Sequence, residues 1–324
     1  MSKIIGIDVS KQTFDVSFLE NNQWKFFKLD NNLKGFKSLI KIASKTDKVI
    51  MEASGPYYLQ LAIFLYEKGV TVVVENPLVI KRFSQAKLYR AKTDRKDAQI
   101  IAEYGERFEK DLKSWEPPST EVLELRSMFT RVELLKKQIH QTKMQFEAFM
   151  SGGTLNPSLK KEMNSILKTL ENSKKKLEKE IEDLANKEYK EIIECLCTIP
   201  GIGIKTATLL CIITDGFKKF ENAKQLVAYV GFSPRVFQSG TSVKGKGHIC
   251  KMGMSQIRKF LYLCSWSAKT KNKQCVELYQ RLKEKGKPER VIKIAMANKL
   301  LRQAFAIGKN KIDYNENFVQ NICI

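Results

Sequence analysis

Residues 3–18 read KIIGIDVSKQTFDVSF. Isoleucine, valine and phenylalanine dominate this stretch, and such β-branched and aromatic runs favour strands. We therefore expect one strand over 3–9 and a second over 13–18, joined by a short turn. Further along the chain, apolar runs predict a strand over 24–29, a helix over 33–43, a strand over 48–51, a helix over 56–67, a strand over 70–74 and a helix over 94–108.

This order of elements predicts a mixed sheet flanked by helices. Strands linked as hairpins pair antiparallel, whereas strands separated by helices pair parallel. Three hairpin strands followed by alternating helix and strand is the order of an RNase H fold. We therefore assign residues 1–112 to an α/β domain of the RNase H or RuvC-like type.

Two prolines, Pro117 and Pro118, break the chain after this domain. Apolar residues then recur every three or four positions on both sides of a turn at 151–157, which predicts two long amphipathic helices. Such a pair forms an antiparallel coiled-coil hairpin, which we place at 113–194. Residues 113–198 hold 15 basic and 14 acidic side chains, a balance that suits packing or oligomerisation better than binding DNA.

The remainder is expected to be a mainly helical C-terminal domain over 195–310, with Gly-rich loops and short helices, and a loose tail over 311–324. Most of the chain's net charge of +22 lies here, because residues 199–324 hold 23 Lys and Arg against 7 Asp and Glu. Such a region attracts a polyanion, since contacts to phosphates release counterions. The alternative is a basic surface that only keeps the protein soluble.

Composition also bears on the cellular compartment. No apolar run reaches the ~18 residues that span a bilayer, and the N-terminus turns acidic at Asp8, too early for a signal peptide. The 7 cysteines include no CxxC pair and only 2 histidines accompany them, which argues against a structural zinc site. We expect a cytoplasmic protein with reduced thiols and no membrane partner.

Three motifs contain acidic side chains. The first lies inside a predicted strand, the second at the end of a predicted strand and the third at the start of a predicted helix. Asp8 lies inside an apolar strand, and a buried lone carboxylate needs a cation or a partner. Glu52 ends another strand in Met51-Glu-Ala-Ser-Gly55. Asp94 and Asp97 open a helix three positions apart and so share a face. Four converging acids would bind a pair of Mg²⁺ ions, or Mn²⁺, able to activate a nucleophile on a phosphodiester.

Each acid also has a simpler interpretation. Asp8 could lie near the end of its strand in water, and Glu52 could pair with a lysine. Asp94 could cap its helix, with Asp97 favourable in the first turn. The order of strand acid, strand acid and helical pair over the predicted fold favours a catalytic metal site.

A Gly-rich turn opens the C-terminal domain at Ile199-Pro-Gly201-Ile-Gly203-Ile-Lys205. It has the form of a helix-hairpin-helix turn, in which backbone amides at a helix N-terminus bind a phosphate oxygen. The alternatives are a turn with no ligand and, for the nearby cations, a solvated face. The further cations expected to contact nucleic acid are Arg235, Lys244, Lys246, Lys251, Arg258 and Lys259.

The stretch 231–253 combines glycines, hydroxyls and cations. A serine in it could act as a phosphoryl nucleophile if a metal lowered its pKa. Ser239 directly precedes a glycine, but its local features also fit a turn serine. Spacing alone does not separate it from Ser233 or Ser242.

Together these blocks resemble the DEDD transposases of insertion-sequence family 110, which include the Piv-type invertases, over nearly the whole chain. The resemblance rests on residues 6–11, 51–55, 92–98, 199–207 and 231–240. It implies that Asp8, Glu52, Asp94 and Asp97 hold Mg²⁺, and that Ser239 forms a covalent phosphoserine link to DNA. The family pattern at this point is Ser-Ser-Gly, and here Gln238 stands in place of the first serine.

The resemblance also implies partners. Similar proteins are RNA-guided recombinases, in which a structured non-coding bridge RNA pairs with donor and target DNA. They act as dimers that form tetramers, with active sites completed across subunits. It further implies a C-terminal transposase domain and a prokaryotic protein that associates with the nucleoid when active.

Our hypothesis is therefore a transposase or site-specific recombinase that exchanges strands through a serine–DNA intermediate. The bond energy kept in that link would permit rejoining without ATP. One rival is a RuvC-like, Mg²⁺-dependent junction endonuclease, which uses water and forms no protein–DNA adduct. A rival of another class is a non-catalytic structural DNA-binding protein, whose activity would survive the loss of Asp8 or Glu52.

Overall fold

A five-stranded sheet in the order β3-β2-β1-β4-β5 forms the centre of the N-terminal part of the chain. Strands β1 (Ile4–Val9), β2 (Thr13–Glu20) and β3 (Gln23–Asp30) pair antiparallel. Strands β4 (Lys48–Glu52) and β5 (Thr71–Glu75) continue the sheet parallel to β1. The prediction of a mixed α/β sheet is confirmed.

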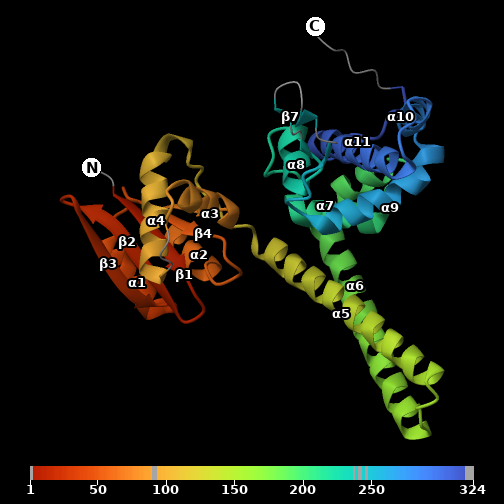
Figure 1. The fold of residues 1–324 in the computed structure, drawn as a ribbon, viewed down its shortest axis with the longest axis horizontal. Coiled ribbons are helices and arrows are strands. Elements are labelled where there is room, and N and C mark those ends of the chain that lie inside the picture. Colours follow the sequence, from red (N-terminus) through yellow and green to blue (C-terminus); the bar gives the residue numbers. More distant parts are fainter. Residues whose placement is uncertain (1–2, 90–92, 236–237, 240–242, 245–246, 318–324) are drawn as a thin grey trace. The chain divides into compact units, whose positions relative to one another are not determined.

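The computed structural model describes residues 3–89, 93–235, 238–239, 243–244 and 247–317. The chain divides into two compact units, Met1–Pro117 and Pro118–Ile324. The first is the α/β unit, and the second is mainly helical, with two long helices (Figure 1).

Helices cover both faces of the sheet in the first unit. Alternation along each strand sends one set of apolar side chains to a core with α1 (Leu33–Ile42) and α2 (Leu59–Glu67). The other set meets α3 (Pro77–Ala86) and α4 (Asp94–Arg107). The sequence patterns did not predict α3.

Helix α4 approaches the sheet closely because of two glycines. A Cβ added to Gly6 of β1 would lie 2.3 Å from the backbone nitrogen of Ala102 in α4. A Cβ added to Gly105 of α4 would lie 1.9 Å from Cδ1 of Ile50 in β4. Only residues without a side chain allow α4 to lie this close to β1 and β4.

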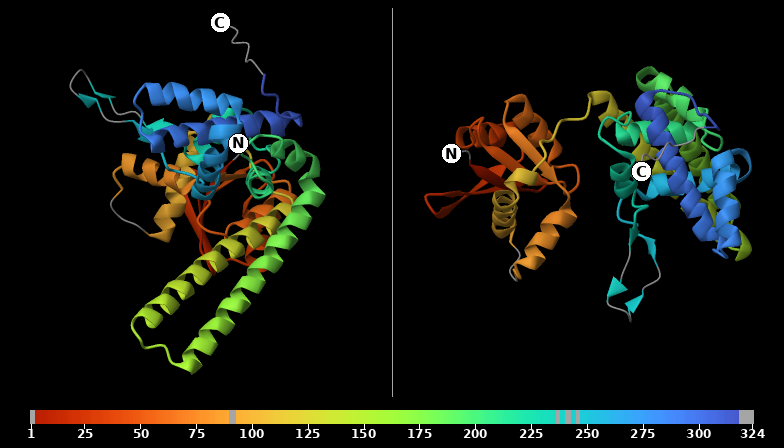
Figure 2. Two further views of the ribbon diagram at one scale, coloured as in Figure 1. Left: turned by 90° about the vertical axis from the view of Figure 1, so that its right-hand side faces the viewer. Right: turned by 90° about the horizontal axis from the view of Figure 1, so that it is seen from above.

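In the second unit, α5 (Thr120–Ser151) and α6 (Pro157–Cys197) pack side by side along their lengths (Figure 2). Their caps follow from the sequence. The Ser119 side chain accepts a hydrogen bond at the start of α5, and the Asn156 side chain does so at the start of α6. Helix α6 leaves helical geometry at Tyr189 (φ −127°, ψ 23°) and then continues to Cys197.

The rest of the second unit is a helical core joined to the end of α6. Its helices are α7 (Ile204–Thr214), α8 (Ala223–Val230), α9 (Ser255–Lys271), α10 (Lys273–Glu284) and α11 (Glu289–Asn310). The expectation of short helices is wrong for α9 and α11, which have 17 and 22 residues. Two-residue strands β6 (Pro234–Arg235), β7 (Gln238–Ser239), β8 (Val243–Lys244) and β9 (His248–Ile249) lie between α8 and α9.

Two further findings concern the remaining sequence predictions. In the described part of the tail, up to residue 317, the Tyr314 backbone N–H donates to Oγ1 of Thr198 at 2.8 Å. Among the described residues, no helix is long and apolar enough to cross a membrane.

Candidate active site and nucleic-acid contacts

Four acidic side chains from three elements line one cavity of about 530 Å³ in the first unit, here called the acidic cavity. Asp8 and Glu52 lie near the carboxyl ends of the neighbouring parallel strands β1 and β4. Asp94 and Asp97 lie in the first turn of α4. Alternation along β1 places Asp8 on the same face as Gly6, the residue on which α4 packs.

The carboxylates of the acidic cavity influence one another. Burial is the largest cause that raises the pKa of Asp8, and together with the nearby charges of Asp97, Glu52 and Asp94 it brings this pKa from 3.8 to about 6. The neighbouring carboxylates therefore oppose ionisation of Asp8 when no cation compensates their charge. A bound cation would relieve this repulsion.

The donor atoms of the acidic cavity suit a hard divalent cation, because all four acids offer carboxylate oxygen. The described residues contain no group of three or more Asp, Glu, His or Cys side chains close enough to hold a metal ion together. The acids thus share a cavity without forming a closed chelate. Asp94 has a side chain that is 71% exposed, so it has room to turn toward an ion.

Local hydrogen bonds stabilise the start of α4, which carries Asp94 and Asp97, and the end of β4, which carries Glu52. Oγ1 of Thr93 accepts a hydrogen bond from the backbone N–H of Lys96 at 3.2 Å, so Thr93 is the N-cap of α4. The alternative in which Asp94 caps this helix is wrong, because Asp94 is its first residue. The hydroxyl of Ser54 donates to the carboxylate of Glu52.

The sequence patterns missed a fifth acid beside the acidic cavity. Asp15 lies opposite Asp8 in the β1–β2 ladder, on the same face of the sheet. Lys28 of β3 reaches both Asp15 and Asp94, with Nζ–carboxylate distances of 3.8 and 3.9 Å. Burial raises the pKa of Asp15, and the charge of Lys28 opposes that shift. Lys28 thus joins the sheet to the start of α4.

The Gly-rich turn of the second unit leads into α7. Gly201 has φ of +105°, and an added Cβ would lie 2.9 Å from Cβ of Ala268 in α9. Gly203 is the N-cap of α7, with nothing within 4 Å of an added Cβ. Lys205 is 75% exposed, and its Nζ lies 3.9 Å from Oε2 of Glu178 in α6. The start of α7 is thus exposed beside a cation.

The other predicted contact residues lie between α8 and the start of α9. The Arg258 guanidinium donates to the Val230 carbonyl at 2.6 Å, which ties α9 to the end of α8. Arg235 pairs with His248 between β6 and β9. Lys251 and Lys259 are exposed.

The predicted nucleophile lies in a short pair of strands. Ser239 of β7 pairs with Val243, the residue next to Lys244 in β8. Ser233 is half-buried, whereas Ser242 and Lys246 lie outside the described residues. The acids of the acidic cavity therefore belong to the first unit and Ser239 to the second.

Comparison with known proteins covers both units. Residues 5–154 match a family model described as transposase, and residues 193–280 match one described as transposase of the IS116/IS110/IS902 family. The chain is 31% identical over 318 residues to the pilin gene-inverting protein of Moraxella lacunata, covering 95% of this chain and 96% of that protein. It is 24% identical to the transposase for insertion sequence element IS1111A of Coxiella burnetii, covering 80% and 76%.

Proposed function

Because the chain belongs to the IS110 family of transposases, we propose that it exchanges DNA strands through a serine–DNA intermediate at a divalent metal site. The observation that carries this proposal is the acidic cavity, where Asp8, Glu52, Asp94 and Asp97 gather from distant parts of the chain. The name of the Moraxella lacunata relative, a gene-inverting protein, supports site-specific recombination.

The proposed architecture extends the observed elements. The mixed strand order of the first unit supports an RNase H or RuvC-like domain over 1–112. The pairing of α5 with α6 supports a coiled-coil hairpin over 113–194 that serves oligomerisation, and the turn before α7 supports a helix-hairpin-helix contact. The transposase domain then spans 195–310, followed by the tail over 311–324.

Mg²⁺ is the cation proposed for the acidic cavity, with Mn²⁺ as a substitute, and it would supply activation of the nucleophile and stabilisation of the leaving oxygen. The sheet positions Asp8 and Glu52 on one side of the cavity, and α4 carries Asp94 and Asp97. Lys28 lies between Asp15 and Asp94, so Asp94 would turn from Lys28 toward the ion when it binds.

Ser239 is the proposed nucleophile. Its hydroxyl gives its proton to solvent, and its oxygen forms a bond to a backbone phosphorus. The bond from that phosphorus to one deoxyribose oxygen breaks, and this oxygen leaves as a hydroxyl with a proton from solvent. The link is again a phosphodiester, so a hydroxyl at another strand end can attack it, join the strands and release the serine. This sequence needs no ATP, because one phosphodiester replaces another at each step.

The second unit is proposed to hold the nucleic acids. Its positive surplus supports contacts to the phosphates of donor and target DNA and of a structured guide RNA. Backbone contacts of this kind position a duplex without reading its sequence, so pairing with the RNA supplies the specificity. Dimers that form tetramers would bring acids and serine together from different subunits. The proposed cellular location is the cytoplasm, at the nucleoid.

Trapping a protein–DNA adduct tests the proposal. The full chain, with its co-purified RNA, is incubated with plasmid DNA carrying the element's ends and Mg²⁺, then denatured and run on a gel. We expect an adduct and joined product from the wild type. Ser239→Ala is expected to lose both, Asp8→Asn to lose both, and the control Ser267→Ala, on the exposed face of α9, to keep both.

The rivals give different results. Cleavage without an adduct would favour the junction endonuclease. Unchanged activity in Asp8→Asn would favour a structural DNA-binding protein. An adduct that survives Ser239→Ala but disappears in Ser233→Ala or Ser242→Ala would assign the nucleophile to that other serine. Sequencing the RNA that co-purifies with the protein tests RNA guidance. The absence of any RNA encoded by the element would contradict RNA guidance.

A further inference from the structure

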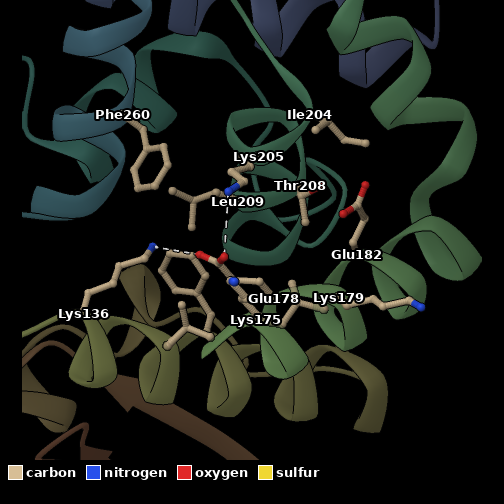
Figure 3. A pocket seen from close by; sticks show the side chains of 13 residues that line it. Lys136, Lys175, Glu178, Lys179, Glu182, Ile204, Lys205, Thr208, Leu209 and Phe260 are labelled. Carbon is tan, nitrogen blue, oxygen red and sulfur yellow. Dashed lines mark ion pairs between the residues drawn. The ribbon is translucent and has the colours of Figure 1, made fainter. Parts of the chain in front are cut away.

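A second cavity, of about 250 Å³, lies inside the second unit between α5, α6, α7 and α9. We call it the lysine-rimmed cavity. Its walls are apolar, with Phe129 and Val132 from α5, Leu209 from α7 and Phe260 from α9. Figure 3 shows the Glu178 carboxylate in the space between Lys136 and Lys205. Its volume lies just below that of pockets for drug-sized ligands, so it can hold one small group.

The hydroxyl of Thr208 is the first sign of a ligand. Thr208 is only 7% exposed and lines the lysine-rimmed cavity, toward which its side chain points (Figure 3). No hydrogen bond joins it to another of the described residues, whereas on the same helix Thr214 donates to the Leu210 carbonyl at 2.6 Å. Thr208 lines the cavity, so its hydroxyl can form a hydrogen bond to a molecule bound there.

Glu178 is the second sign. Its side chain is 25% exposed and lies 3.7 Å from Nζ of Lys136 and 3.9 Å from Nζ of Lys205. Lys174 lies 3.9 Å from the same carboxylate, and all three distances exceed a hydrogen bond. The carboxylate therefore retains acceptor positions for a ligand that carries N–H groups.

The positive charges at the rim indicate which chemical group is attached to that ligand. Lys175, Lys179 and Lys205 border the opening, and Lys205 immediately follows the accessible start of α7. A ligand with N–H donors, an aromatic body and an anionic attachment is a nucleobase on its phosphate backbone. Aromatic side chains such as Phe129 and Phe260 bind the faces of unpaired bases.

We propose that the lysine-rimmed cavity binds one unpaired guanine of a nucleic acid strand. Guanine offers N1–H and the 2-amino group side by side, which match the two oxygens of Glu178, and its O6 or ring nitrogen accepts from Thr208. The rim lysines contact the flanking phosphates. The inference rests on the proposed function, since it assumes that the second unit holds DNA or RNA, and it assigns a base-specific contact to that unit.

Fluorescence anisotropy with the full chain tests this site. The probes are labelled oligothymidylates with no guanine, with one central guanine, or with one central hypoxanthine, which lacks the 2-amino group. We expect the single guanine to tighten binding of the wild type about tenfold and hypoxanthine to lose most of that gain. The same series in RNA shows whether the base comes from RNA or DNA, by the larger gain.

Two variants and two matched controls separate recognition from folding. Glu178→Gln and Thr208→Val are expected to lose the guanine gain while keeping the wild-type melting curve. Glu171→Gln removes another acid of α6, which pairs with Lys143 at 2.7 Å outside the cavity, and Thr169→Val removes another helical hydroxyl. Both controls are expected to keep the gain.

Equal affinity of the wild type for the guanine and thymine probes in both DNA and RNA would overturn the inference, as would a full guanine gain in Glu178→Gln. Asp8→Asn distinguishes this failure from a failure of the proposed function. That protein is expected to make no adduct yet to keep the guanine gain, because Asp8 belongs to the first unit.

Discussion

Gly6 of β1 lies directly beneath Ala102 of α4, and a Cβ added to Gly6 would come within 2.3 Å of the Ala102 nitrogen. This contact sets the distance between helix and sheet. Asp8 follows Gly6 by two residues on the same face, and Asp97 precedes Ala98, the other α4 residue that Gly6 contacts. The close approach therefore also determines how near the acids of strand and helix can come.

Gly6→Ala is expected to destabilise the first unit by about 3 kcal/mol, because the methyl group must displace the backbone of α4. Urea unfolding measures this loss. The matched control is Gly203→Ala, where nothing lies within 4 Å of the added Cβ. Equal unfolding midpoints for wild type and Gly6→Ala would contradict the observed packing.

Asp8→Asn is expected to stabilise the metal-free protein at neutral pH. The pKa of Asp8 is raised to about 6 in the folded state, from 3.8. Between these values the folded state binds a proton that the unfolded state lacks, so stability falls as the pH rises through this window. Allowing for solvent screening, we expect a gain of about 1–2 kcal/mol at pH 7.5 and none near pH 3.5.

Urea unfolding in a chelator at both pH values measures this difference. Asp30→Asn, at the exposed end of β3, serves as the control and is expected to change neither value. A variant that is less stable than the wild type at pH 7.5 would show that the Asp8 charge is already compensated without metal.

Mg²⁺ is expected to raise the melting temperature of the first unit, because an ion bound among the four acids favours the folded state. At a concentration about a hundredfold above its dissociation constant, the stabilisation is about 2.7 kcal/mol. Asp97→Asn should remove most of the shift, whereas Glu67→Gln, an exposed acid of α2, should keep it. The measurement is a thermal melt against NaCl of equal ionic strength, and the same shift in Asp97→Asn would place the ion elsewhere.

Arg126→Met is expected to destabilise the second unit by about 2–4 kcal/mol. The Arg126 guanidinium donates to the carbonyls of Ile212 and Ile213 at 3.3 and 3.1 Å, so it joins α5 to the last turn of α7. Chemical unfolding followed by circular dichroism measures the loss. Arg131→Met, at an exposed position of the same helix, is the control, and equal losses in both variants would rule out this role.

The strands and most helices of the first unit could be predicted because each depends on a local apolar pattern. The missed helix α3 also had a local signal. Asn76 caps it, and Pro77 stands at its first position, where a proline begins a helix instead of breaking it.

The acids of the candidate site could be proposed from sequence because strand ends and helix starts are local features. Asp15 and Lys28 required strand register. Part of that register was readable, since Asn21-Asn22 forms a two-residue turn with φ of 50° and 59°, which pairs Asp15 with Lys28. The contact between Glu178 and Lys205 depends on how α6 meets α7, and no local pattern encodes that packing.

The interruption of α6 at Tyr189 has a mechanical consequence. Pro157, at the distal end of this helix, stands 32 residues before Tyr189, which at 1.5 Å per residue makes a lever arm of about 48 Å. A bend of roughly 5° at this pivot would sweep the far tip through about 4 Å. The Tyr189 hydroxyl donates to Oδ1 of Asp215 at 2.9 Å, so the pivot is anchored beside the end of α7.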